Sequence, residues 1–169
     1  GNPILVQAGA AAISADKMTG TGLTAAETGL NDPLLNTADG QQCLGGCVDF
    51  VITNLPAGTD YVDIVYRLSA PIVEGAIYRK LINGVWTNFN TSGQDQLGSN
   101  GAGSSVCNDD QLPPGLRADA LCIFLRIYDG GSNDADGVKN CIVVDPSGAL
   151  VAGSPNVPAG STSGCSISN

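Results

Sequence analysis

Apolar and polar residues alternate along the middle of the chain with the two-residue period of a β-strand. The alternation is clearest in residues 61–69, where Tyr61, Asp63, Val65, Arg67 and Ser69 fall on one face and Val62, Ile64, Tyr66 and Leu68 on the other. This pattern predicts a strand with one buried face and one solvent-facing face. Residues 48–54 alternate in the same way, and residues 121–128 form a further run of β-forming side chains.

Asn83-Gly84 is the strongest turn signal in the chain and separates residues 77–82 from residues 85–89. A type I′ turn needs positive φ at both central positions, which Asn and Gly tolerate, so we expect a β-hairpin here. Tyr78 and Trp86 lie on this hairpin. An aromatic pair on a strand can bind a sugar by stacking, although such residues more often cover the rim of a core.

Turn residues divide the chain into three parts. Residues 1–13 are small and apolar and predict a strand, which either completes the sheet of its own molecule or is donated to a neighbouring one. Residues 14–150 predict a β-sandwich domain, with a long polar loop at 90–115 and a last core strand that ends in a turn at Asp145-Pro-Ser-Gly. Residues 151–169 are rich in Gly, Ser, Pro and Thr and predict an extended tail.

Composition supports one all-β domain. The chain has 169 residues, of which 23 are Gly and only 14% are charged, and this suits a turn-rich β-protein better than a helical one. We therefore expect an antiparallel β-sandwich of Ig-like or jelly-roll-like type with long loops. No apolar run reaches the roughly 20 residues of a membrane helix, so no transmembrane segment is expected in this chain.

Charge and residue usage exclude several functions. The net charge is −9 and the seven basic residues are scattered, whereas a nucleic-acid binder needs a basic stripe. The absence of histidine excludes Ser-His-Asp and Cys-His catalysis and histidine-ligated zinc. No carboxylate is singled out by an apolar setting, so we expect a protein that is not an enzyme. Lys17, Lys80 and Lys139 can in principle join an Asn in an intramolecular cross-link, which the sequence does not reveal.

The six cysteines predict disulfides and an oxidising, extracellular location. They stand at Cys43, Cys47, Cys107, Cys122, Cys141 and Cys165 and lack the two Cys-x-x-Cys pairs of a zinc site. Three bonds allow 15 pairings. A bond between Cys43 and Cys47 would close a very short ring, and one between Cys107 and Cys122 would pin the long loop. The chain begins with Gly1 and shows no signal peptide, so we expect the mature form of a secreted or cell-surface protein.

Residues 129–145 carry the densest set of oxygen ligands. Ca²⁺ takes six to eight oxygens, and Asp134, Asp136 and Asn140 fit an alternating arrangement with the backbone carbonyl of Val138 between them. The full predicted set is Asp129, Asn133, Asp134, Asp136, Val138, Asn140 and Asp145. The fifth-position acid and terminal Glu of an EF-hand are missing. The segment predicts a structural calcium site, and the alternative is a solvated hairpin loop built from Asx turns.

The segment Asp129-Gly-Gly-Ser-Asn-Asp-Ala-Asp-Gly-Val-Lys-Asn, followed by Ile-Val-Val-Asp-Pro-Ser-Gly, resembles the acidic signature of the bacterial choice-of-anchor U domain. Residues 48–58 and 76–89 look like an early strand and a Tyr-x-Lys…Trp hairpin of that family, so the resemblance covers roughly residues 45–150. It implies a secreted or cell-surface β-sandwich without known catalysis, preceding a varied C-terminal sorting signal.

The resemblance also implies disulfide pairings. Cys107 and Cys122 sit where many members carry a pair, and Cys141 stands where the family usually has Gly. Once Cys43 is paired with Cys47, and Cys107 with Cys122, Cys165 remains as the partner of Cys141.

These observations predict a structural subunit of an extracellular filament, layer or matrix. Its partners would be copies of itself, joined by exchange of the N-terminal strand. The alternative is an adhesive or carbohydrate-binding module that recognises surface glycans through Trp86, Tyr78 and the 90–115 loop.

Overall fold

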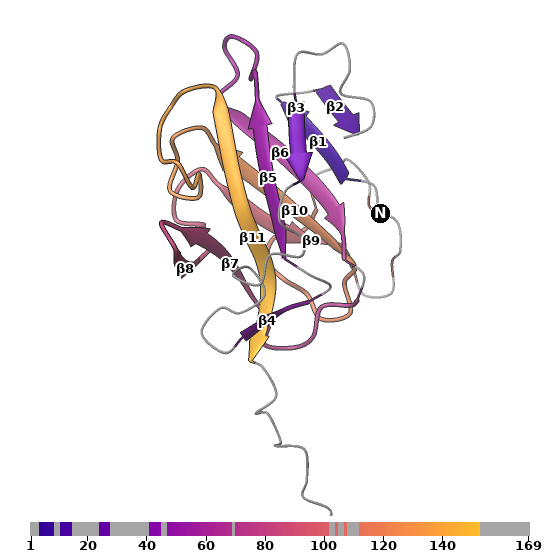
Figure 1. Ribbon diagram of the computed structural model, residues 1–169. Coiled ribbons are helices and arrows are strands. Elements are labelled where there is room, and N and C mark those ends of the chain that lie inside the picture. Colours follow the sequence, from indigo (N-terminus) through magenta and orange to yellow (C-terminus); the bar gives the residue numbers. More distant parts are fainter. Residues whose placement is uncertain are drawn as a thin grey trace, which may run out of the picture.

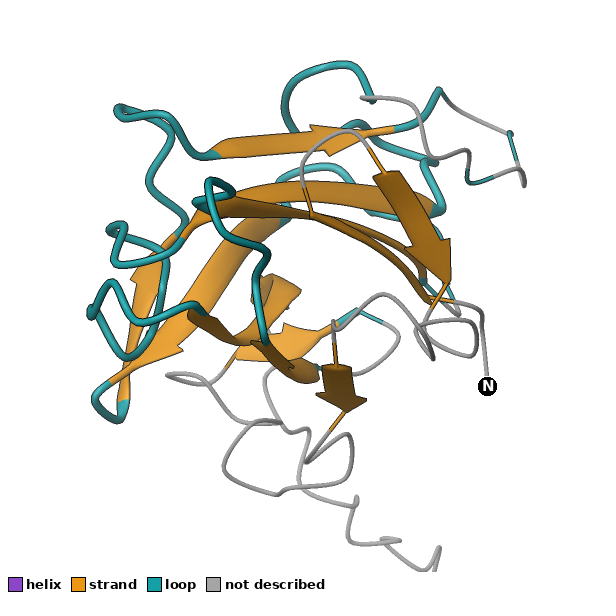
Figure 2. Ribbon diagram, turned by 90° about the horizontal axis from the view of Figure 1, so that it is seen from above, coloured by secondary structure: helices purple, strands orange, loops and turns teal. Residues whose placement is uncertain are grey.

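A computed structural model describes residues 4–8, 11–14, 24–27, 41–44, 47–68, 70–101, 104, 107 and 112–152. In these residues the chain folds into two antiparallel β-sheets that pack face to face, and no helix is present (Figures 1 and 2). The predicted all-β sandwich is therefore confirmed at this level. The predicted 151–169 tail lies outside the described residues from 153 onward.

One sheet joins the N-terminal strands to the middle of the chain. Its strands are β1 (Ile4–Ala8), β2 (Ala11–Ser14), β6 (Tyr61–Arg67), β9 (Gln96–Ser99) and β10 (Cys122–Tyr128), in the spatial order β2-β1-β6-β10-β9. β6 lies at the centre, with β1 on one side and β10 on the other. In this structure β1 thus completes the sheet of its own chain.

The other sheet is organised around the last strand. It contains β3 (Thr24–Glu27), β4 (Gln41–Cys43), β5 (Val48–Thr53), β7 (Ile77–Ile82), β8 (Val85–Asn88) and β11 (Ile142–Ala152), in the order β3-β5-β11-β7-β8. β4 pairs with the end of β11 outside this order. Figure 1 shows β11 running the length of the sheet, so this one strand holds β4, β5 and β7 in place.

The core lies between the two sheets. Every second residue of β10 points into it, as Ile123, Leu125 and Ile127 are fully buried. The facing sheet contributes Ile52 and Val143, which are also fully buried. Each such side chain stabilises the fold by roughly 1.5–3 kcal/mol relative to an exposed position.

The prediction of a solvent-facing side on β6 is only partly correct, because Arg67 is exposed but the middle of that face is buried. Asp63 and Val65 belong to the predicted wet face, yet they are only 6% and 2% exposed. β10 carries Arg126 beside Asp63, and the guanidinium donates two hydrogen bonds of 2.7 Å to the two carboxylate oxygens. The same guanidinium lies 4.4 Å from the ring centroid of Tyr61. Because β6 is a central strand, side chains of the neighbouring β10 cover part of this face. The same face would be exposed if β6 were at the edge of the sheet.

The predicted hairpin is confirmed. β7 and β8 pair up to the contact between Ile82 and Val85, which leaves Asn83 and Gly84 as the two-residue turn. Their φ angles are 51° and 78°, both positive as a type I′ turn requires.

The predicted 90–115 loop contains a strand that the sequence does not signal. β9 pairs with β10 although Gln-Leu-Gly-Ser has no apolar alternation. A Cβ atom at Gly98 would lie 2.7 Å from the carbonyl oxygen of Leu112 and 2.9 Å from that of Pro113. Glycine is needed here because another stretch of backbone crosses the strand closely.

The predicted turn at Asp145-Pro-Ser-Gly is also wrong, because β11 continues through it to Ala152. Pro146 faces Asp49 of β5, and pairing with β7 begins only at Ser147. At Pro146, therefore, β11 is not paired with β7 along one of its edges. Proline has no backbone N–H to donate, and a strand tolerates this loss at an unpaired edge.

Candidate functional site

The acidic segment forms the connection between β10 and β11, and its carboxylates bind its own backbone. The two oxygens of Asp129 accept hydrogen bonds from the N–H groups of Asn140 (3.0 Å) and Cys141 (2.7 Å). Asp136 accepts from the N–H of Val138 (2.9 Å) and from the side-chain amide of Asn140 (3.1 Å). These bonds tie the end of the segment to its beginning.

Asp134 joins this segment to β11. Its oxygens accept hydrogen bonds from the N–H groups of Gly130 (2.8 Å) and Val144 (3.0 Å). Burial raises the pKa of Asp134 above its usual value, and the two N–H groups oppose that shift. The charge of Lys80 acts in the same direction as those N–H groups.

Asn133 binds the adjoining loop, not its own segment. Its side chain accepts from the N–H of Asn90 (2.8 Å) and donates to the carbonyl of Asn90 (2.7 Å) and to Asp95 (2.7 Å). Asp95 also accepts from the N–H of Tyr128 (2.8 Å) and of Asn133 (3.3 Å). Asp95 was not among the predicted site residues, because a single Asp in a polar loop has no distinguishing sequence context.

Glycine allows the acidic segment to fold back on itself. Gly130 has a φ of 74°, and a Cβ atom there would lie 2.7 Å from the backbone nitrogen of Lys139. Any larger residue would both strain the backbone and push Lys139 away.

The predicted calcium ligands lie in the acidic segment and on β11. Within the described residues, no three or more acidic or cysteine side chains are grouped so that they can hold a metal ion. The oxygens of Asp129, Asp134 and Asp136 face N–H donors, although an ionised carboxylate can accept more bonds than these. Calcium binding by this segment stays a prediction.

Asp145, the last of the predicted ligands, lies in the protein interior. Its carboxylate is 2.7 Å from the ammonium of Lys80 on β7, and both side chains are 0% exposed. The positive partner neutralises this carboxylate, which leaves it out of any cation site at the surface. Its partnership with Lys80 was not visible in the sequence, since the two residues come from strands far apart in the chain.

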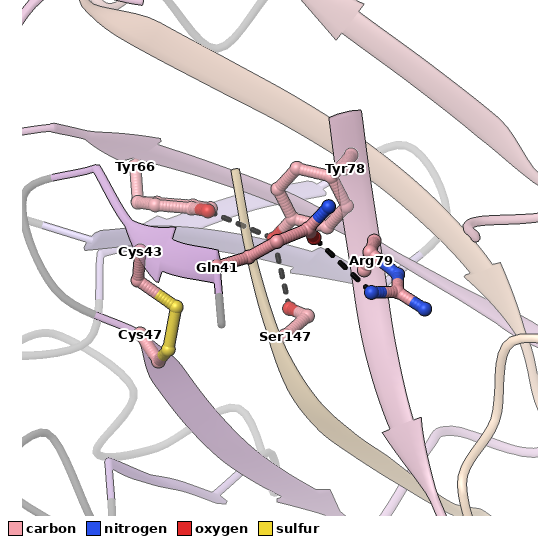
Figure 3. The surroundings of a disulfide bond; sticks show 7 residues. All are labelled: Gln41, Cys43, Cys47, Tyr66, Tyr78, Arg79 and Ser147. Atoms are coloured by element: carbon pink, nitrogen blue, oxygen red, sulfur yellow. Dashed lines mark hydrogen bonds between the residues drawn. A yellow bond between two sulfur atoms is a disulfide. The ribbon is translucent and has the colours of Figure 1, made fainter. Parts of the chain in front are cut away.

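A chain of hydroxyl groups lies in the same interior layer (Figure 3). The hydroxyl of Tyr78 is 2.8 Å from that of Tyr66 and 2.8 Å from that of Ser147. Burial raises the pKa of both tyrosines, and the nearby charge of Asp145 adds to this effect. Tyr66 comes from one sheet and the other two residues from the other, so the hydroxyl chain connects the sheets.

Two of the three predicted disulfides are present within the described residues. Cys43 and Cys47 connect β4 to the start of β5, and Figure 3 shows this bond close to Gln41 and Ser147. Cys107 and Cys122 connect the 90–115 loop to β10. Cys141 is exposed with a φ of 65°, a conformation that favours glycine. Its predicted partner Cys165 lies outside the described residues, so that bond stays a prediction.

The aromatic pair proposed for glycan binding is buried. Tyr78 is 2% and Trp86 7% exposed, and Trp86 packs against Cys47 and Leu150 beside the first disulfide. Neither ring forms an exposed stacking platform.

A separate cavity of about 960 Å³ lies between the hairpin and β9. Its walls include Phe89, Gln94, Leu97, Tyr128 and also Tyr78, whereas Trp86 does not line it. Its volume is within the range of small-molecule sites.

The fold and these sites define an all-β, disulfide-stabilised sandwich module. Comparisons of the chain with protein-family models, curated proteins and solved structures found no match. The resemblance to the choice-of-anchor U domain therefore rests on the quoted residues alone. In the described residues, no helix is long and apolar enough to cross a membrane.

Proposed function

We propose that this chain is a non-enzymatic structural module of a secreted or cell-surface assembly, with a sandwich of the Ig-like or jelly-roll-like type. The observation that carries the proposal is how the polar side chains are used. The carboxylates of Asp129, Asp134 and Asp136 bind backbone N–H groups, and Asp145 pairs with Lys80. Groups that resemble a reactive site are thus engaged in holding strands and loops together.

The disulfides support an extracellular location. Bonds of this kind persist in oxidising compartments and are rare in the cytosol. The Cys43–Cys47 bond packs beside β11, and the Cys107–Cys122 bond holds a long loop on β10. A module that must survive outside the cell benefits from both.

Self-assembly through the N-terminal segment is the proposed use of the module. β1 pairs with β6 over five residue pairs, from Ile4 with Tyr66 to Ala8 with Val62. An identical segment from a neighbouring molecule can form the same backbone pairs, which is the basis of strand exchange between copies.

Deletion of residues 1–13 tests this proposal. We expect the full chain to form filaments or oligomers in electron microscopy and light scattering, and the deleted chain to lose them. Addition of a synthetic peptide of residues 1–13 should restore the thermal stability of the deleted chain. A full chain that stays monomeric at high concentration would contradict assembly by strand exchange.

The cavity between the hairpin and β9 favours an alternative function, a carbohydrate-binding or adhesive module. Glycan-array binding by the full chain would support it, and Gln94→Ala or Tyr128→Ala should then weaken binding because both residues line the cavity. Thr87→Ala is a matched control, since Thr87 is exposed on the same hairpin and is not among the cavity residues.

A further inference from the structure

Lys80 and Asp145 meet between the two sheets in a way that an ordinary ion pair does not explain. Nζ of Lys80 lies 2.7 Å from Oδ1 of Asp145, and both side chains are 0% exposed. Yet neither Nζ nor either carboxylate oxygen has a hydrogen-bond partner in the described protein. A charge-assisted pair of this length is normally also a hydrogen bond. The ammonium and the carboxylate are therefore in close contact, but their geometry is not that of a hydrogen bond.

The strands determine that these two groups meet. Lys80 of β7 pairs with Ser147 of β11, and Asp145 is two residues earlier on the same face of β11. Diagonal neighbours of this kind are within reach of a long side chain. The hydroxyl of Ser147 is bonded to the hydroxyl of Tyr78 (2.8 Å). The ammonium of Lys80 instead lies against the carboxylate of Asp145.

We propose that Nζ of Lys80 and Cγ of Asp145 join in an intramolecular amide bond. A proton first passes from the ammonium to the carboxylate, which produces a neutral amine and a carboxylic acid. The amine lone pair then attacks Cγ and forms the N–C bond. The acid hydroxyl leaves with a second proton from nitrogen as water, so the ammonium and the carboxylate become one amide and one water molecule.

The surroundings favour each part of this reaction. An interior that excludes water favours the neutral amine and acid over separated charges. The folded strands hold the reacting groups together, which removes most of the entropic cost of bringing them into contact. The product replaces two buried charges by a neutral group, and no oxidant, metal or other reactant is needed. The amide would link β7 to β11 covalently.

Intact mass spectrometry of the purified chain, with all disulfides reduced, tests the proposal. We expect a mass lower than that of the sequence by one water molecule. Protease digestion should yield a branched peptide that joins the segment around Lys80 to the segment around Asp145, and trypsin should not cleave after Lys80. A mass equal to that of the sequence would overturn the proposal.

A water can also be lost by succinimide formation at Asp129-Gly130 or Asp136-Gly137, so the position must be mapped. A water loss confined to one linear peptide, or one that disappears when hydroxylamine opens a succinimide, would likewise overturn the proposal. Lys80→Arg and Asp145→Ala should each restore the full mass, whereas Lys139→Arg should retain the loss because Lys139 is 69% exposed and pairs with Asp60 at 3.7 Å.

The wild-type mass decides the proposal even if the core variants fail to fold. The result is also independent of assembly, since a monomer can carry the bond and a filament can lack it.

Discussion

Gly148 of β11 lies directly against the sulfur of Cys43. A Cβ atom at residue 148 would be 2.9 Å from Sγ of Cys43 and 3.6 Å from Cα of Cys47. The glycine that resembles a turn signal in the sequence is instead the place where the short disulfide ring packs onto the last strand. The contact connects β4, β5 and β11 at one point.

Replacement of Gly148 by Ala should destabilise the fold by about 1–3 kcal/mol, the usual cost of overfilling a packed site. Chemical denaturation followed by the fluorescence of Trp86, which packs beside this disulfide, measures the change. Gly93→Ala is the control, because a Cβ atom there meets no other atom within 4 Å. An equal effect of the two variants would show that the contact with Cys43 does not matter.

Tyr66 and Tyr78 should remain protonated as long as the protein is folded. Burial raises both pKa values above the ordinary value of about 10. Their contribution to stability is therefore complete below about pH 10 and is lost as the pH rises toward the folded-state values, because the unfolded chain releases these protons first. An alkaline titration should show tyrosinate absorbance from Tyr66 and Tyr78 only when Trp86 fluorescence reports unfolding.

Variants assign that absorbance. Tyr66→Phe and Tyr78→Phe should each reduce the step that accompanies unfolding. Ionisation of either tyrosine well before the fluorescence change would show that the hydroxyl chain with Ser147 is open to solvent.

Loss of the Cys107–Cys122 bond should lower the free energy of unfolding by about 3 kcal/mol, the loop-closure value for the sequence separation of 15. The double variant Cys107→Ser, Cys122→Ser, compared with wild type in urea, measures this effect. A loss well below about 1 kcal/mol would mean that side-chain hydrogen bonds already order the 90–115 loop. Examples are the bonds that Oδ1 of Asn100 accepts from the N–H groups of Leu121 and Cys122.

Thiol labelling of the unfolded, unreduced chain tests the third predicted disulfide. We expect no free thiol, because Cys141 and Cys165 should be bonded to each other. Two labelled cysteines at these positions would contradict the bond. Non-reducing peptide mapping that links Cys165 to any other cysteine would contradict the predicted pairing.

If calcium binds to the acidic segment, a chelator should lower the midpoint temperature of thermal unfolding, because a ligand of the folded state stabilises that state by mass action. Asp136→Asn, at an exposed position, should then reduce the chelator effect. Glu74→Gln, another exposed acid, is the control. No bound metal on elemental analysis together with an unchanged midpoint would mean that the hydrogen bonds of Asp129 and Asp134 hold the segment alone.

Local features of this chain were predictable because they depend on neighbouring residues. The alternation around Ile64 and the run of β-forming residues around Ile123 predict strands. Asn83-Gly84 predicts a tight turn because both residues tolerate positive φ. The even cysteine count predicts disulfides, and the strand ends agree with the structure to within one or two residues at β5, β6 and β10.

Tertiary structure decided what each polar residue does. Asp145 belongs to an acidic run in the sequence, but β11 turns it toward Lys80 in the interior. Pro146 and Gly148 are residue types that are common in turns. Pairing of β11 with β5 and β7 nevertheless keeps both in an extended strand. The sequence alone determined the central strands β5, β6 and β10, the hairpin and the presence of disulfides, since these follow from local backbone and side-chain chemistry. Which face of each strand is buried, and which charges meet there, depends on contacts between distant segments that no local pattern encodes.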